Sequence, residues 1–160
     1  LLGALEAAGI KEGKIGIVNV NAATASTVAR EAGFREAFEG SKFEILETQY
    51  GEGDAAKSKD IAANYITQGC VGIFGANEGS TVGTGNAIRE SGEKVIGVGF
   101  DKSDTILSLI KEGHLLATMS QNPDVMGYEG MKTAAKALAG EATGADYVDT
   151  GVSVIKQGDI

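Results

Sequence analysis

The sequence predicts an α/β protein, built as a doubly wound parallel sheet within a flavodoxin-like, three-layer αβα lobe. Short apolar runs alternate with longer amphipathic segments along almost the whole chain. Strands separated by helices of about 10–15 residues form parallel βαβ units, and right-handed crossovers then place helices on both faces of the sheet. The 24 glycines and the single proline agree with this fold, because it needs many short turns.

Elements in the first half of the chain follow from apolar spacing and from turn residues. Apolar residues at helical spacing predict an opening helix that ends at Gly9, and Asp54 is a good N-cap for a later helix. Continuous apolar runs predict buried strands. The expected order is helix 1–8, strand 14–20, helix 24–38, strand 42–49, helix 54–67 and strand 71–75. The side chains expected to face the core from the two longer helices are Val28, Phe34, Phe38, Ile61, Tyr65 and Ile66.

The second half of the chain continues the same alternation. A helix ends at Gly92, Ser103 or Asp104 opens the next one, and Pro123 lies in the first turn of the last. The expected order is helix 81–90, strand 94–100, helix 103–111, strand 115–119, helix 122–138 and strand 147–155.

Length and composition predict one globular domain. At 160 residues the chain can bury a sizeable core, and its 42% hydrophobic and 22% charged content are ordinary globular values. The net charge of −8 comes with no basic cluster, which argues against a nucleic-acid partner.

No apolar run approaches the roughly 18 residues of a membrane span. The chain starts at Leu1 without a basic region, so no signal segment is expected in it. The single cysteine, Cys70, lies in an apolar strand and is expected in the core.

Signatures of phosphate binding are weak in this chain. The dinucleotide pattern GxGxxG must lie between a strand and a helix, whereas Gly83-Thr84-Gly85 falls within a helix and Gly97-Val98-Gly99 within a strand. No P-loop pattern occurs. The loop over 21–27 offers hydroxyls at a helix N-terminus, where an anion could bind, but helix capping accounts for them equally well.

Catalytic constellations are also lacking. His114 is the only histidine and lies in a charged turn, so a zinc-type site is not expected. There is no GxSxG elbow. The positions where a phospho-aspartate receiver carries acidic residues hold Asn19, Asn21 and Asn77. The sequence therefore predicts a protein that is not an enzyme and that has no cofactor and no metal.

Polar residues follow three of the expected strands. Asn77, Asp101 and Gln121 each come at the carboxyl end of an apolar run, and Arg30 lies on the helix after the first strand. Because the carboxyl ends of parallel strands form the ligand-binding edge of such sheets, we expect these four residues to converge. Amide, carboxylate and guanidinium groups hydrogen-bond hydroxyls, and none of the four is a base set up for proton transfer. The set predicts a site for a polyhydroxylated small molecule. The alternative explanation is that Asn77 and Asp101 only cap the helices that follow them.

Four segments in order carry a family resemblance. They are STVAREAGF at 26–34, IFGANEGSTVGTGNAI at 73–88, VIGVGFD at 95–101 and ATMSQNPDVMGYEGM at 117–131. Together they resemble the type I periplasmic sugar-binding proteins, whose fold is shared by the effector domains of LacI-type repressors. The ribose-binding group is the nearest comparison.

The resemblance implies roles for the same four residues. In the family, the Arg of the first segment, the Asn after the third strand, the Asp of the GFD motif and the Gln next to the hinge contact sugar hydroxyls. These correspond to Arg30, Asn77, Asp101 and Gln121. The implied protein is the non-catalytic solute-binding component of an ABC importer, periplasmic or extracellular, with a sugar and a membrane permease as partners.

The chain also departs from the family. A typical member is about twice as long, and the amino-terminal lobe that would complete the sugar site is missing here. Glu78 stands where the family often has Asp, and Gly53 stands where an aromatic residue is expected, with Tyr50 nearby. We therefore expect a half-site whose sugar affinity in isolation is weak or undetectable.

Residues 1–160 are expected to form a single lobe, in which 122–147 is a helical segment that would pack on the absent lobe in the full-length family. Its central part, 124–138, offers apolar residues: Val125, Met126, Met131, Ala135 and Leu138. Without the other lobe this helix either covers its own sheet or pairs with a second copy to give a homodimer.

Two other functions remain open from the sequence. The chain could be the effector domain of a LacI-type transcriptional regulator, for which an attached helix-turn-helix segment would be the sign, and none is present here. It could also be an isolated or engineered flavodoxin-like folding unit without activity.

Overall fold

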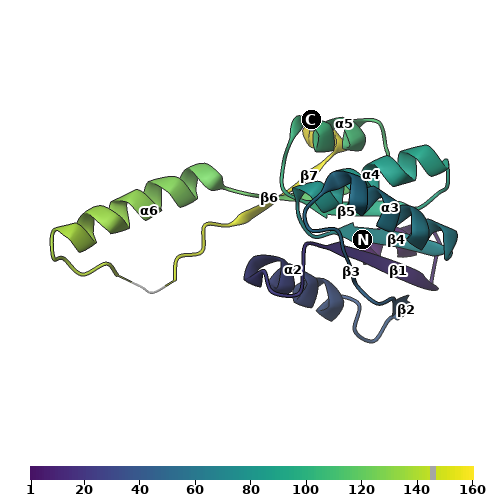
Figure 1. The fold of residues 1–160 in the computed structure, drawn as a ribbon, viewed down its shortest axis with the longest axis horizontal. Coiled ribbons are helices and arrows are strands. Elements are labelled where there is room, and N and C mark those ends of the chain that lie inside the picture. The colour runs from purple at the N-terminus through teal and green to yellow at the C-terminus, as the bar shows by residue number, and fades with distance from the viewer. Residues whose placement is uncertain (145–146) are drawn as a thin grey trace.

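The computed structural model describes residues 1–144 and 147–160. Within that part, the strands form one sheet in the order β2-β1-β4-β5-β6-β7, with β3 also pairing with β1 (Figure 1). The strands are β1 (Glu12–Asn19), β2 (Lys42–Ile45), β3 (Gln49–Tyr50), β4 (Cys70–Gly75), β5 (Ile96–Phe100), β6 (Ala117–Gln121) and β7 (Val152–Lys156). All pairs are parallel except β6 with β7, which is antiparallel. The predicted doubly wound α/β fold is confirmed, with an antiparallel strand added at one edge.

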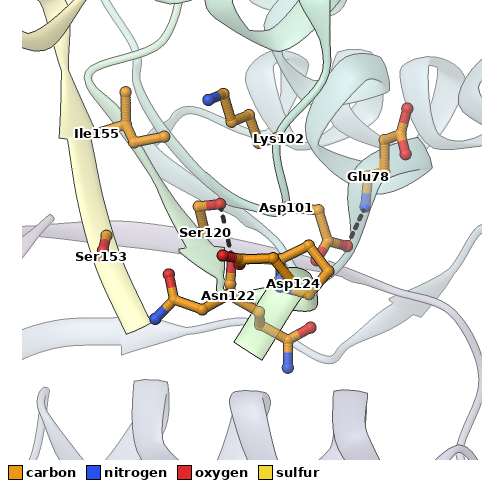
Figure 2. Close-up of a pocket in the computed structure, with 10 residues that line it drawn as sticks. Glu78, Asp101, Lys102, Ser120, Asn122, Asp124, Ser153 and Ile155 are labelled. Atoms are coloured by element: carbon orange, nitrogen blue, oxygen red, sulfur yellow. Dashed lines mark hydrogen bonds between the residues drawn. The ribbon is translucent and has the colours of Figure 1, made fainter. Parts of the chain in front are cut away.

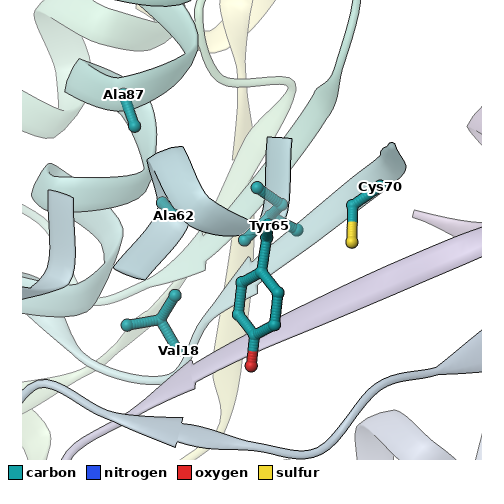
Figure 3. Packing of buried hydrophobic residues seen from close by; sticks show 6 residues of the cluster. Val18, Ala62, Tyr65, Cys70 and Ala87 are labelled. Carbon is teal, nitrogen blue, oxygen red and sulfur yellow. The ribbon is translucent and has the colours of Figure 1, made fainter. Parts of the chain in front are cut away.

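Helices cover both faces of this sheet. They are α1 (Leu2–Ala7), α2 (Ala25–Glu36), α3 (Ala55–Thr67), α4 (Glu78–Ser91), α5 (Asp104–Lys111), α6 (Pro123–Leu138) and the short 3-10 helix η1 (Gln157–Asp159). Successive side chains of a strand point to opposite faces. Ile17 and Phe74 therefore pack with Phe34 of α2, whereas Val18 and Ile73 pack on the opposite face. There they meet Ala62 and Tyr65 of α3 and Ala87 of α4 (Figure 3).

Capping residues fix where the central helices start. The Asp54 side chain accepts a hydrogen bond from the Lys57 amide, which confirms it as the N-cap of α3. Ser103 caps α5 in the same way. Helix α4 ends at Gly92 in the left-handed conformation that glycine tolerates, as expected.

Close approach of α4 to the sheet depends on a glycine. A Cβ at Gly99 of β5 would overlap the side chain of Thr81. The Thr81 hydroxyl bonds the carbonyl oxygens of Asn77 (2.7 Å) and Phe100 (3.0 Å) and accepts from the Phe100 amide (2.9 Å). Thr81 is fully buried, so these bonds tie the first turn of α4 to the end of β5.

Some sequence expectations were wrong in detail. Val28 was expected to face the core, but it is 43% exposed, because the inward face of α2 is formed around Thr27 and Phe34. The expected strand 42–49 divides into β2 and β3. The expected strand 147–155 begins only at Val152, and helix α4 starts at Glu78, three residues before the expected position.

The segment after β6 leaves the body of the lobe. None of the residues of α6 is buried, and Figure 1 shows α6 standing apart from the sheet and from the other helices. The alternative in which this helix covers its own sheet is therefore wrong for this structure. The predicted end of the helix near Leu138 is confirmed, but the helix does not extend to 147. Residues 145 and 146 of the expected 122–147 segment lie outside the described residues.

Two further points concern the membrane and the cysteine. Among the described residues, no helix combines the length and the apolar character needed to span a bilayer. Cys70 is 3% exposed, which confirms it as a core residue, and burial raises the pKa of its thiol to about 11.

Candidate ligand-binding site

The four polar residues expected to converge do meet at the carboxyl edge of the sheet. Arg30 reaches across from α2, and its Nη2 donates to Oε1 of Gln121 at 3.0 Å. Its Nη1 lies 3.7 Å from Oδ2 of Asp101. Asn77 follows β4 and is joined to the set through its neighbour Glu78, whose amide donates to the same Asp101 oxygen at 3.0 Å. The structure thus brings Arg30, Asp101 and Gln121 into direct contact and places Asn77 beside them.

Four groups hold the Arg30 guanidinium in place. Besides Gln121 and Asp101, its Nη1 donates to the Ala76 carbonyl at 2.9 Å. The guanidinium lies over the Phe100 ring, 3.8 Å from its centroid, in the geometry of a cation–π contact. Burial lowers the pKa of Arg30 and the carboxylate of Asp101 opposes that shift. An arginine keeps its charge in either case, so the site contains a fixed cation with oriented donors.

Asp101 has an unusual backbone conformation that aims its carboxylate. Its φ of 73° lies in the left-handed region, which Asp tolerates better than most residues. Its amide donates to the Met119 carbonyl at 2.7 Å, and its carbonyl accepts from the Thr118 hydroxyl at 2.7 Å. Asp101 does not cap the helix that follows it, since Ser103 does so. Its carboxylate instead accepts the Glu78 amide at the start of α4, where the helix dipole favours a negative charge.

Asn77 does cap the helix that follows it. Its Oδ1 accepts from the Ser80 amide at 3.0 Å, which confirms the capping interpretation for this residue. Capping uses the oxygen only. Among the described residues, none accepts a hydrogen bond from its Nδ2, so this donor remains available at the edge of the sheet.

A pocket of about 600 Å³ adjoins the site (Figure 2). Asp101 and Gln121 belong to its lining, whereas Arg30 and Asn77 do not. The full lining is Glu78, Asp101, Lys102, Ser120, Gln121, Asn122, Pro123, Asp124, Ser153 and Ile155. The four-residue set therefore forms an open, polar edge with a pocket on one side of it.

Sequence reasoning missed several partners in this set. The Ala76 carbonyl and the Glu78 amide are backbone groups, and their types give no sign of a polar role. Phe100 was assigned to a strand, although its place directly before Asp101 was a usable signal for a ring beside the site. Tyr50, proposed as a nearby aromatic, ends β3 and is 45% exposed.

The loop over 21–27 is ordered by a turn around Asn21 rather than by a side-chain cap, because Thr24 is the N-cap of α2 but makes no capping hydrogen bond. Oδ1 of Asn21 accepts from the amides of Ala23 and Thr24 and from the Thr24 hydroxyl, at 2.8–2.9 Å. The Asn21 side-chain carbonyl oxygen and the Thr24 hydroxyl are thus used within the turn that precedes α2. Elsewhere in the described residues, no three His, Cys, Asp or Glu side chains come together in a way that could hold a metal ion.

Comparison with known proteins gives consistent matches over most of the chain. Residues 1–142 match the model of the family described as periplasmic binding protein domain. The ribose import binding protein RbsB of Haemophilus influenzae is 34% identical over 122 residues, which cover 75% of this chain and 42% of that protein. The D-allose-binding periplasmic protein of Escherichia coli is 30% identical over 129 residues, covering 78% and 42%. This chain thus spans less than half the length of these two relatives.

Solved structures agree in fold. An ABC transporter solute binding protein from Agrobacterium vitis with bound D-fucose superposes with a TM-score of 0.90 at 30% identity. The match covers 99% of this chain and 56% of that one. A carbohydrate transporter solute binding protein from Agrobacterium radiobacter in complex with D-arabinose gives a TM-score of 0.90 at 29% identity, covering 99% and 55%.

Proposed function

This chain belongs to the periplasmic binding protein domain family, and on that premise we propose that it is a non-catalytic sugar-binding lobe of an ABC-importer solute-binding protein. The observation that carries the proposal is the contact of Arg30, Asp101 and Gln121 at the carboxyl edge of the sheet. These groups, with the Nδ2 of Asn77, offer hydrogen-bond donors and acceptors to vicinal hydroxyls. The relatives named for ribose, allose, D-fucose and D-arabinose support a monosaccharide as the ligand class.

The mechanism is reversible capture rather than chemistry. The cation of Arg30 and the carboxylate of Asp101 are already oriented by their neighbours, so a sugar can exchange its hydration for fixed hydrogen bonds without reorganising the site. On an open edge these bonds compete with water, because hydrogen bonds gain strength only where water is excluded. We therefore assign this chain half of a site, with weak affinity by itself.

A second lobe supplies the other half of the site. This chain covers 56% of the superposed solute-binding protein from Agrobacterium vitis, and its α6 stands away from its own sheet. The segment 122–147 is the part proposed to pack on that lobe. A membrane permease is the further partner, and the periplasm or the extracellular space is the proposed location, in keeping with the family.

The test is a titration of this chain with ribose, allose, D-fucose and D-arabinose, followed by amide NMR, which detects millimolar affinity. We expect saturable shifts at Arg30, Asn77, Asp101 and Gln121 for at least one sugar. Asp101→Asn should abolish these shifts, because it removes the negative charge from the site. The fold should be retained, since asparagine has the same size as aspartate and also tolerates a positive φ.

The matched control is Asp60→Asn, which removes the same charge from an exposed position of α3. This variant should bind as the unmodified chain does. Equal affinity in Asp101→Asn, or saturable shifts confined to other parts of the lobe, would contradict the assignment of the site. A lack of saturable shifts in the well-folded chain would contradict sugar binding by this lobe.

A further inference from the structure

Helix α2, which carries Arg30, has little apolar attachment to the lobe. Thr27 is its only buried residue. Phe34 adds a stacked contact with Phe74, with ring centroids 4.6 Å apart. The middle of the helix is instead held by polar contacts of two consecutive residues, Arg30 and Glu31.

Glu31 ties α2 to β1 and to the connection between β2 and β3. Its Oε2 accepts from Nδ2 of Asn19, the last residue of β1, at 2.7 Å. Its Oε1 accepts from the Thr48 hydroxyl, between β2 and β3, at 2.5 Å and from Nε of Arg35 at 2.9 Å. Arg35 also donates to the Thr48 hydroxyl at 2.8 Å. We call these four residues, Asn19, Glu31, Arg35 and Thr48, the Glu31 clamp.

The clamp is built for a carboxylate. The Asn19 side chain is fully buried and also donates to the Thr27 carbonyl, while its oxygen accepts the Val20 amide. Its orientation is therefore fixed, and it presents a donor to Glu31. Arg35 presents another donor to the other oxygen. An amide in place of the Glu31 carboxylate would turn its own NH2 toward one of these two donors, leaving a part-buried donor without an acceptor.

We propose that Glu31 is a positioning residue for Arg30. Adjacent residues of a helix lie about 100° apart around its axis, so the two side chains leave α2 in different directions and contact different strands. Glu31 anchors α2 to β1 and to the β2–β3 connection. This anchoring fixes the position of α2 along its own axis and its rotation about that axis, and so sets where Arg30 contacts Ala76, Phe100 and Gln121. The inference rests on the proposed function only for what Arg30 binds, because its position is measurable without a sugar.

The ring of Phe100 provides a direct readout of that position. Protons of a group that lies over an aromatic face are shifted upfield, and the Arg30 guanidinium lies over this ring. The chain has only three arginines, Arg30, Arg35 and Arg89, so their side-chain NMR signals are separable. In the sugar-free chain, we expect Glu31→Gln to reduce the upfield shift of the Arg30 side-chain protons by at least about half, with the fold retained.

The control is Glu36→Gln, which makes the same change at an exposed position of α2. It should leave the Arg30 signals where they are. A loss of stability alone does not move the signals of the folded form, so the shift separates positioning from a purely structural role. If the Arg30 signals of folded Glu31→Gln coincide with those of the unmodified chain, the proposal is wrong.

A second variant guards against misfolding of the first. Thr48→Val removes one donor to Glu31 from outside α2 and should move the Arg30 signals in the same direction by a smaller amount. Unchanged Arg30 signals in folded Thr48→Val would also overturn the proposal. For a sugar that binds, Glu31→Gln should weaken affinity by about fivefold, the effect of one lost hydrogen bond. If no sugar binds but the Arg30 signals move, the proposed function fails while the positioning role stands.

Discussion

Asp101 and Asn77 each hold the start of α4 while facing the candidate site. The Asp101 carboxylate accepts a hydrogen bond from the Glu78 amide, and the Asn77 side-chain oxygen accepts one from the Ser80 amide. A ligand that binds these side chains would therefore meet groups whose orientation is set by backbone donors. Capping and binding were opposed explanations at the level of sequence, but one residue can serve both, because a carboxylate or an amide has more hydrogen-bonding capacity than one cap uses.

Sequence reasoning predicted this site through the position of residues relative to strands. Asn77, Asp101 and Gln121 follow apolar runs, and parallel topology brings such positions to one edge. The partner of the Asp101 carboxylate was not predictable in the same way. The left-handed backbone at Asp101 turns its side chain toward α4, the helix that follows the neighbouring strand β4. No local sequence pattern indicates this direction.

Acid should remove the contribution of Glu31 to stability. Burial raises the pKa of Glu31, but the hydrogen bonds from Thr48, Asn19 and Arg35, with the charge of Arg35, lower it by more. A carboxyl group with a lowered folded-state pKa stabilises the protein above its unfolded pKa of about 4.3, and that stability is lost as pH falls through the folded value. The gap in free energy of unfolding between the unmodified chain and Glu31→Gln should be constant near neutral pH.

That gap should narrow below about pH 4, where the unmodified carboxyl group takes up its proton. Urea denaturation at a series of pH values measures it. Glu36→Gln, which removes an exposed carboxylate from the same helix, is the control for the loss of one charge from α2. A gap that stays constant to pH 3 would contradict an ionised Glu31 in the folded protein.

At the scale of elements, the type and order of helices and strands were predictable, and their packing partners were less so. Apolar runs and caps located the strands and central helices because these signals are local. The exposure of Val28 and the division of strand 42–49 into two depend on how α2 and α3 lie over the sheet. The fit between Gly99 and Thr81 likewise joins residues far apart in sequence.

Two glycines should respond in opposite ways to alanine. At Gly99 an added Cβ would overlap Thr81 and disturb the bonds between α4 and β5, at a cost of about 1–3 kcal/mol. At Gly33, within α2, no atom lies within 4 Å of an added Cβ, and alanine is the better helix former by about 0.8–1.0 kcal/mol. Denaturation midpoints should fall for Gly99→Ala and rise for Gly33→Ala. A stable Gly99→Ala would show that Thr81 can move aside at little cost.

At the scale of the whole molecule, α6 stands out because none of its residues is buried among the residues that the structure describes. Met131 is 73% exposed and Leu138 is 91% exposed, and seven residues apart they lie on the same side of the helix. The apolar residues of 124–138 were expected to need a cover, but the sequence could not choose among the sheet, a second copy and another lobe. That choice is made by tertiary contacts, and the lobe's own sheet is not the cover in this structure.

We expect the isolated chain to associate with a second copy through this helix. Sedimentation velocity across a wide concentration range should show a monomer–dimer equilibrium. Replacing both residues by glutamate, as Met131→Glu with Leu138→Glu, should shift it to monomer, because charge would have to be buried in the contact. Ala137→Glu, about 100° around the helix axis from Leu138, should have less effect. A strictly monomeric chain at all concentrations would contradict dimerisation.

The connection between α6 and the lobe consists of two adjacent strands, and this geometry limits how the helix can move. β6 and β7 are paired from Ala117 with Lys156 to Gln121 with Val152, and Asn122 donates to the Thr150 carbonyl at 2.8 Å just beyond the last pair. Sliding the two strands past each other would break these ladder bonds, whereas bending or twisting the ribbon can keep them. Gln121 forms the last pair of this ladder with Val152, two residues before α6 begins. Because the ladder and Arg30 both hold Gln121 on the lobe, we expect a change in the direction of α6 to move Gln121 less than it moves the far end of the helix.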